Sequence, residues 1–197
     1  AAALVALAAL VPGGLRAWRL QRALAAARAS AAPADAVAAW TKVLAFDPAQ
    51  PEALAGRAEA RLLVLDLRGA RADADQLVSL RPGEARSLCV RAHVHSVGGD
   101  PAQAIRDLRE VVELEPRRPK AWQKLAELLL RQGSLLEAEQ ASSQALSLEP
   151  EDGRALLVRG SARLGRTGLG EGARLGEAET DLLAALQLGV KDAAGPL

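Results

Sequence analysis

Cys89 and His93 are the residues whose types and spacing come nearest to chemistry. They stand four positions apart, so on a helix they would share one face. A thiol beside an imidazole could serve as nucleophile and base, but this spacing supplies neither a lowered thiol pKa nor an oxyanion hole. A zinc site needs three or four ligands, and no second His or Cys cluster accompanies the pair. We therefore expect no catalytic residue, no metal site and no cofactor.

A second candidate for chemistry is the glycine-rich stretch between residues 165 and 176. It contains no Gly-Lys-Ser or Gly-Lys-Thr and follows no strand pattern, so it does not predict a phosphate-binding loop. We interpret it as a connection between two helices. Nucleic-acid binding would need a basic stripe with stacking aromatics, whereas the net charge is +1 and Trp18, Trp40 and Trp122 are scattered. We expect no nucleic-acid partner.

The composition predicts which elements must position these side chains. Half of the 197 residues are apolar, but aromatic residues make up only 2%. Ala, Leu, Arg, Glu and Gln dominate, and all are strong helix formers. Runs of β-branched residues, which strands prefer, are missing. A single cysteine excludes an internal disulfide framework. The sequence therefore predicts an all-α protein.

The helices are organised by a repeat. A large apolar residue followed two positions later by proline recurs at intervals of 34 residues. The copies are Phe46-Asp47-Pro48, Leu80-Arg81-Pro82, Leu114-Glu115-Pro116 and Leu148-Glu149-Pro150. Such self-similarity is typical of a helical-repeat array. We expect a segment 1–16, then an array over 17–188 with units 17–50, 51–84, 85–118, 119–152 and 153–188, and a tail over 189–197.

Local signals place helix ends inside the units. Gly98-Gly99-Asp100-Pro101 predicts a helix end followed by a capped helix start. Ser134 and Glu137 have the spacing of a capping box. Asp35 is expected to cap the second helix of the first unit. These signals predict two helices per unit, joined by short turns.

The 34-residue period, the two helices per unit and the closing proline resemble the tetratricopeptide repeat. The fourth unit matches the family pattern at Trp122, Leu125, Ala126, Leu129, Gly133, Ala138, Ala145 and Pro150. The resemblance covers residues 17–188 and implies a right-handed α-solenoid of about five helix-turn-helix repeats. It also implies small residues where paired helices cross closely, which here are Ala58, Ala92, Ala126 and Gly160, and Ala36, Ala70, Ala104, Ala138 and Ala178.

Arginine and aspartate occur together when the units are aligned. Units two, three and five carry an Arg in the first helix and an Asp in the second, and the other two units lack both. The aligned residues are Arg57 with Asp73, Arg91 with Asp107, and Arg159 with Asp181, against Leu125 with Ala141 and Ala23 with Ala39. A planar guanidinium can donate two hydrogen bonds to a carboxylate. We predict a salt bridge between the helices of each Arg-containing unit.

The resemblance also implies where a partner would bind. Tetratricopeptide arrays line a concave face with the first helix of each unit, and they bind peptides or helices there. The implied lining residues are Leu62, Leu63, Cys89, His93, Val97, Gln123, Glu127, Leu130, Arg131, Leu157 and Leu164. Arg86, Lys120 and Arg154 share one register and would line an edge, either as a solvated face or as a contact for acidic groups. The chain has no Asn, which excludes the family's Lys/Asn clamp for chaperone tails.

Residues 1–15 carry no charge and precede Arg16. The eleven residues before Pro12 are too few to span a bilayer, which needs about 20. They could be the end of a membrane anchor or signal segment, or a helix packed on the first repeat.

The repeat array as a whole predicts a non-catalytic scaffold that binds a partner peptide or amphipathic helix. The alternatives are a membrane-tethered subunit of an envelope or membrane assembly, or a regulatory domain of a larger enzyme, so the location is either cytoplasmic or membrane-associated and periplasmic.

Overall fold

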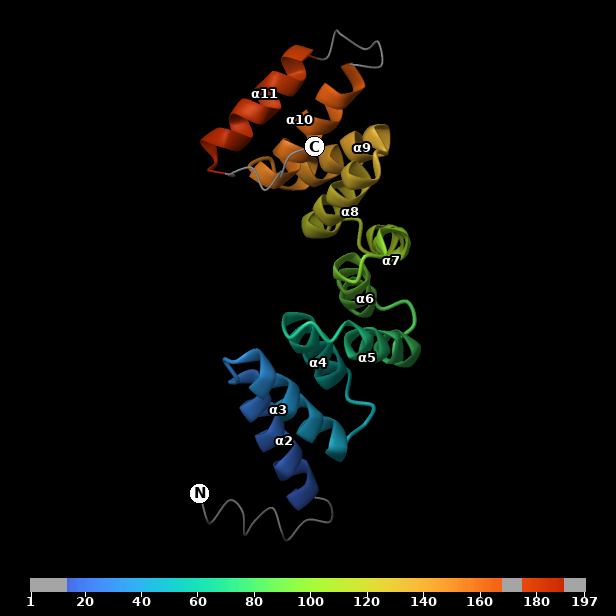
Figure 1. Ribbon diagram of the computed structural model, residues 1–197, viewed down its shortest axis with the longest axis vertical. Coiled ribbons are helices and arrows are strands. Elements are labelled where there is room, and N and C mark those ends of the chain that lie inside the picture. Colours follow the sequence, from blue (N-terminus) through green and yellow to red (C-terminus); the bar gives the residue numbers. More distant parts are fainter. Residues whose placement is uncertain (1–13, 168–174, 190–197) are drawn as a thin grey trace. The chain divides into compact units, whose positions relative to one another are not determined.

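The computed structural model describes residues 14–167 and 175–189. All regular structure in these ranges is helical, which confirms the all-α prediction (Figure 1). The helices are α2 (Gly14–Arg28), α3 (Pro33–Phe46), α4 (Pro51–Leu63), α5 (Leu67–Leu80), α6 (Ala85–Val97), α7 (Pro101–Leu114), α8 (Pro119–Gln132), α9 (Leu135–Leu148), α10 (Gly153–Thr167) and α11 (Leu175–Gln187).

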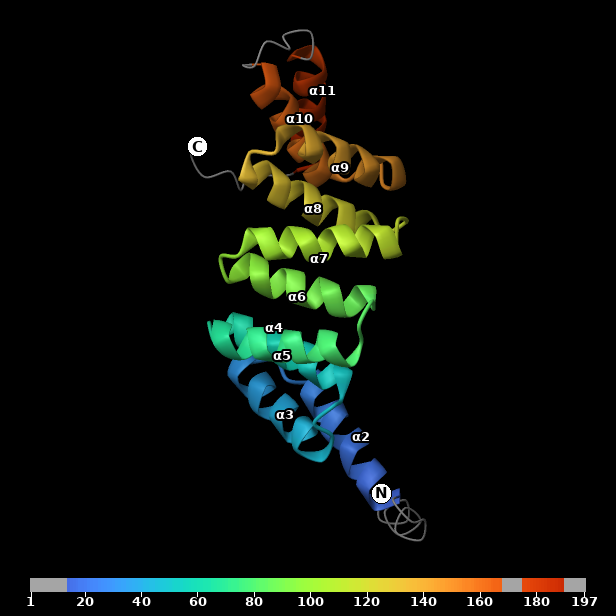
Figure 2. The same cartoon turned by 90° about the vertical axis from the view of Figure 1, so that its right-hand side faces the viewer.

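The chain divides into two compact units, Ala1–Gly99 and Asp100–Leu197, and each is described by itself. In the first unit α2 packs on α3, α3 on α4, α4 on α5 and α5 on α6, and α4 also touches α6. The second unit repeats this order from α7 to α11, and α8 also touches α10 (Figures 1 and 2). Within each unit, every helix thus packs on its sequence neighbours, as in a tetratricopeptide-like array.

The prolines explain where the helices begin and end. Pro51, Pro101 and Pro119 occupy the first turns of α4, α7 and α8, where a missing N–H has no helical partner to lose. The repeated prolines all follow helix ends, since α3, α5, α7 and α9 stop two residues before them. Asp100 caps α7 by accepting a hydrogen bond from the Gln103 N–H at 3.3 Å, as the sequence predicts.

Two predicted helix starts and one predicted helix cap differ from the structure. The helix α2 begins at Gly14, before residue 17, where the first unit was expected to begin. Pro33 already occupies the first turn of α3, so Asp35 lies inside the helix and Ala32 stands at the cap. Ser134 makes no side-chain cap on α9. The capping box fails because Glu137 pairs instead with Arg109 of α7, at 2.5 Å.

Small residues stand where helices cross closely, as the repeat alignment predicts. Ala58, Ala70, Ala126 and Ala138 are fully buried. A Cβ on Gly160 would lie 2.8 Å from Leu182 of α11. The second helices of the repeats therefore approach the first helices through positions with little or no side chain.

The apolar core of the first unit surrounds a tryptophan. Trp40, Leu54 and Leu77 belong to one buried cluster that runs from α2 to α6. A Cβ on Gly56 of α4 would lie 2.4 Å from the Trp40 ring, so the indole packs directly on the α4 backbone. In the second unit Leu146 and Leu156 are buried together, with Trp122 packed against them.

The glycine-rich connection is shorter than the sequence suggests. The helix α10 continues through Gly165 to Thr167, and α11 begins at Leu175. A Cβ on Gly165 would lie 3.0 Å from Leu135, so this glycine allows α10 to pack closely on α9.

The predictions for residues 1–13 and for most of the tail lie outside the described residues. None of the helices in residues 14–167 and 175–189 is both long and apolar enough to cross a membrane.

Candidate partner-binding surface

An ion-pair cluster joins α4 to α5. The Arg57 guanidinium donates two hydrogen bonds to Asp73, at 2.9 and 2.7 Å. Arg61, one turn further along α4, donates to the same carboxylate at 2.6 Å and to the Gly69 carbonyl at 3.0 Å. The Asp73 side chain is 3% exposed. Two arginines thus hold one buried carboxylate, which fixes the register of this helix pair.

The same cluster recurs between α10 and α11. Arg159 donates to both oxygens of Asp181, at 2.8 and 2.6 Å, and Arg163 donates to Asp181 at 2.8 Å. Arg163 and Arg61 hold the same position in their repeats, four residues after the paired arginine. Arg91 belongs to the first unit and Asp107 to the second, so that predicted salt bridge stays a prediction.

A buried carboxylate of α9 extends the second cluster. Glu139 is 7% exposed. It accepts hydrogen bonds from Arg163, at 3.0 Å, and from Arg166. Burial lowers the pKa of the Arg163 guanidinium, but the hydrogen bond to Glu139 and the charge of Asp181 outweigh this and raise it. Repeat alignment did not reveal Glu139, because it pairs with the neighbouring repeat rather than its own.

Three of the predicted lining leucines in the second unit, Leu130, Leu157 and Leu164, lie on α8 and α10, which pack on each other, and we call these leucines the apolar strip. Leu164 is 46% exposed, and Leu130 and Leu157 are partly exposed. Glu127, also on α8, has a side chain that is 17% exposed. Gln123 does not line the surface as expected. It is 3% exposed and donates to Glu127 at 3.2 Å, so it lies beneath the strip.

The basic edge of this strip is neutralised within the unit. The Lys120 ammonium lies 3.1 Å from Asp152 and 3.5 Å from Glu149. The hydrogen bond to Asp152 raises the pKa of Lys120, although partial burial opposes this. Arg154 lies 3.8 Å from Glu127, which also binds Lys124 at 2.9 Å. Arg131 is exposed. These pairs reduce the attraction of the edge for an acidic partner.

The predicted lining residues of the first unit differ widely in exposure. Leu63 is 71% exposed and Val97 is 47% exposed, whereas His93 is exposed and Cys89 partly buried. Leu62 is 6% exposed and belongs to the buried core, so it does not line the surface. Within the described part of the chain, no group of three or more His, Cys, Asp and Glu side chains could hold a metal ion.

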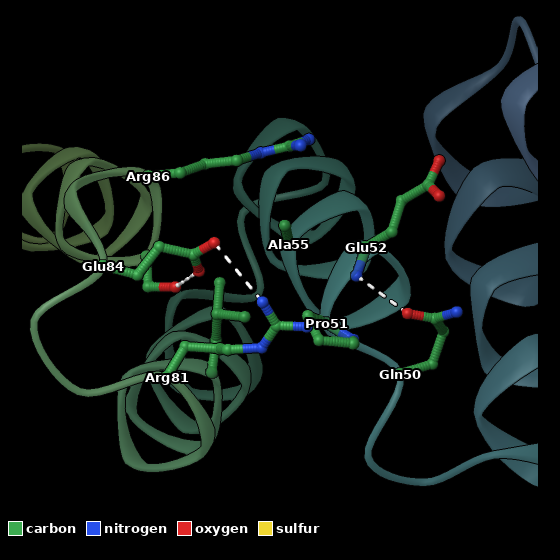
Figure 3. A pocket seen from close by; sticks show the side chains of 9 residues that line it. Gln50, Pro51, Glu52, Ala55, Arg81, Glu84 and Arg86 are labelled. Atoms are coloured by element: carbon green, nitrogen blue, oxygen red, sulfur yellow. Dashed lines mark hydrogen bonds and ion pairs between the residues drawn. The ribbon is translucent and has the colours of Figure 1, made fainter.

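A cavity of about 210 Å³ lies where α4 begins, α5 ends and α6 begins (Figure 3). Its wall includes Ala55 and Leu77 and the charged side chains of Arg81, Glu84 and Arg86. Glu52 also lines it, but its carboxylate accepts two hydrogen bonds from Arg28, both 2.6 Å long. This pairing lowers the pKa of Glu52. Sequence reasoning placed Arg86 on an edge but did not reveal the cavity.

The turn between α4 and α5 carries a second feature that sequence reasoning missed. Leu65 has a φ of 62° and is 78% exposed. In the aligned units this position holds Gly99 and Gly133, whose φ angles are 78° and 81°. The signal was present in the alignment, because a leucine stands where the next two units have glycine. A left-handed leucine is strained, so this turn does not have the residue that best suits it.

Comparison with known proteins agrees with the helix packing. Residues 98–162 match the model of the tetratricopeptide repeat family, which confirms the resemblance. Solved structures of MamA and YrrB share the fold. The structure of MamA 41-end from Desulfovibrio magneticus RS-1 has a TM-score of 0.71 and 19% identity, with 91% of this chain and 96% of that chain covered.

Two further structures give a similar result. MamA AMB-1 has a TM-score of 0.73 and 17% identity, and the match covers 86% of this chain and 96% of that chain. YrrB, described as a tetratricopeptide protein with an unusual peptide-binding site, has a TM-score of 0.63 and 17% identity, with 79% and 77% covered. At such identities the likeness shows the fold alone. No curated protein sequence matches this chain.

Proposed function

We propose that this chain, whose residues 98–162 match the tetratricopeptide repeat family, is a non-catalytic scaffold that binds a segment of another protein. Tetratricopeptide folds are typical protein-interaction modules, and repeat arrays present extended surfaces to their partners. The binding surface we propose is the apolar strip of α8 and α10, formed by Leu130, Leu157 and Leu164. The occupant would be a peptide or an amphipathic helix of the partner.

The observation that carries this proposal is the contrast between the strip and its borders. Leu164 leaves 46% of its surface in water, while the neighbouring charges of Lys120, Lys124 and Arg154 are paired within the unit. A partner gains by covering the leucines, at about 25 cal/mol per Å² of apolar surface removed from water. It does not have to supply charges for the border. The strip therefore suits apolar side chains at helical spacing.

Affinity purification with the full chain tests this proposal. Leu164→Glu places a charge on the strip and should abolish retention of the partner. Leu136→Glu is the matched control, because Leu136 is 52% exposed but lies on α9, outside the strip. Leu130→Glu is a second strip variant, and circular dichroism checks that all three fold. Retention that survives both strip changes would remove α8 and α10 as the binding surface.

The alternative of a membrane tether depends on residues 1–15. Their lack of charge followed by Arg16 is the observation that favours it. Co-sedimentation with lipid vesicles tests the idea: Leu7→Glu should release the chain if this segment binds the membrane. Equal sedimentation of the wild type and Leu7→Glu would contradict the membrane-tether alternative. The alternative of a regulatory domain predicts instead that the retained partner is an enzyme whose rate changes on binding.

A further inference from the structure

The cavity between α4, α5 and α6 has a counterpart site in the second unit, two repeats further along the sequence. The aligned residues are Glu52 with Lys120, Ala55 with Gln123, Arg81 with Glu149, Glu84 with Asp152, and Arg86 with Arg154. In the second unit the Lys120 ammonium lies between two carboxylates, 3.1 Å from Asp152 and 3.5 Å from Glu149. That site is thus closed by its own side chains.

Lys120 and Gln123 fill the site in the second unit, and the first unit has different residues at both positions. Ala55 is too short to fill the space that buried Gln123 takes in the other unit. Glu52 stands where Lys120 would be, but Arg28 of α2 binds its carboxylate through two hydrogen bonds of 2.6 Å. Figure 3 shows the Glu52 carboxylate turned away from Arg81 and Glu84. The result is a cavity of about 210 Å³ that side chains from three helix ends surround.

The charges around this cavity leave one cation in excess. Arg28 neutralises Glu52, and Arg81 lies 3.6 Å from Glu84. Glu84 also accepts a hydrogen bond of 2.5 Å from the Ser87 hydroxyl. Three guanidinium groups therefore stand against two carboxylates, and the third belongs to Arg86, which is exposed and acts on Glu52 through its charge rather than through a hydrogen bond.

Arg86 differs from its counterpart in its surroundings. Arg154 lies 3.8 Å from Glu127. The corresponding glutamate, Glu59, does not line the cavity, and no ion pair joins it to Arg86 among the residues that the structure describes. Figure 3 shows the Arg86 side chain extended above Ala55, with Arg81 on the other side of Ala55. A guanidinium in this position offers a fork of N–H donors to an incoming group.

We infer that this cavity binds the carboxylate of an acidic side chain, Asp or Glu, in the partner of the proposed function. Arg86 donates the hydrogen bonds to that carboxylate, and Arg81 adds positive charge from the opposite side. Ala55 and Leu77 contact the methylene groups. A doubly charged phosphate fits less well, because Glu52 and Glu84 on the wall would repel the second negative charge.

Nuclear magnetic resonance of the full chain tests the inference with a defined probe. Capped glutamate, acetylated at its amine and methylamidated at its carboxyl group, should shift the Arg86 side-chain Nε–Hε signal and the Ala55 amide. Capped glutamine should not. Arg86→Gln should weaken binding of the glutamate probe by about ten-fold, the loss of one charge-assisted hydrogen bond. Arg154→Gln, at the closed counterpart site, should leave the affinity unchanged.

The inference is overturned if both probes give the same shifts, if glutamate gives none, or if Arg86→Gln binds as well as the wild type. This inference rests on the proposed function for its biological partner, so a second arm separates the two. Random displayed peptides are selected on the wild type and on Arg86→Gln. If the selected peptides bind the wild type and Arg86→Gln equally well and share no acidic residue, that result would support the scaffold function but contradict the acidic subsite. Failure to select any peptide would count against the scaffold function. The probe titration would still show whether the cavity binds a carboxylate.

Discussion

Asp73 accepts both arms of the Arg57 guanidinium, at 2.9 and 2.7 Å, with only 3% of its side chain exposed. Arg61 adds a third hydrogen bond of 2.6 Å to the same carboxylate. The geometry explains why an arginine in α4 accompanies an aspartate in α5. Either residue alone would leave a charge at a helix crossing that water hardly reaches, and such a charge is costly.

Asp73→Ala should therefore destabilise the chain strongly. Removing one partner of a buried ion pair typically costs about 3–5 kcal/mol, because the remaining charge loses its compensation. Here Arg57 and Arg61 would both lose their shared carboxylate, so we expect a value in that range. Urea unfolding followed by circular dichroism measures it.

The chain itself offers the control for this substitution. The fourth repeat has Leu125, Leu129 and Ala141 at the aligned positions. The triple variant Arg57→Leu/Arg61→Leu/Asp73→Ala copies that combination and should be more stable than Asp73→Ala alone. A triple variant that loses as much stability as the sum of its single changes would show that the three residues do not act together.

The sequence predicted the helix pairs well because their ends depend on local chemistry. Proline, glycine and a capping aspartate act within one turn, so Pro51, Pro101 and Asp100 could be interpreted without any knowledge of packing. The capping-box prediction at Ser134 was wrong for the opposite reason. Glu137 had a competing partner on another helix, Arg109, which no local pattern reveals.

The candidate sites were predictable only in part. Repeat alignment identified the Arg57 and Asp73 positions because both partners recur in register. It did not reveal the cavity, whose existence depends on a short Ala55 and on Arg28 drawing Glu52 aside. Three residues contribute to that result, and each contribution depends on side-chain length and direction rather than on the repeat period.

Leu65→Gly should stabilise the chain. A non-glycine residue in the left-handed region costs about 1–2 kcal/mol, and glycine avoids this cost. Gly also makes the unfolded chain more flexible, which offsets part of the gain, so we expect about 0.5–1 kcal/mol. Leu65→Ala is the matched control, since it removes the same exposed side chain but keeps the strained φ. Equal denaturation midpoints for the two variants would show that the backbone at Leu65 is not strained.

Gly56→Ala should destabilise the first unit even though alanine favours helix. The propensity gain is about 1 kcal/mol, but the new methyl group would lie 2.4 Å from the Trp40 ring, which has no room to move within the core. Overpacking of a core typically costs about 1–3 kcal/mol, so the net effect should be a loss. Gly176→Ala, with open space around its Cβ, serves as the control and should be neutral or stabilising. Circular dichroism during thermal unfolding measures the result.

Glu52→Gln should make stability less sensitive to acid. The hydrogen bond from Arg28 lowers the pKa of Glu52 from its ordinary value of 4.5. A group with a lowered folded-state pKa stabilises the fold fully above its ordinary pKa, and this contribution is lost as the pH falls through the lowered value. The wild type should therefore be more stable than Glu52→Gln at neutral pH, and the difference should shrink below pH 4.5. Urea midpoints measured across this range test the expectation, with Glu151→Gln, an exposed glutamate on the turn after α9, as the control. A difference that stays constant with pH would contradict the proposed link between Arg28 and Glu52.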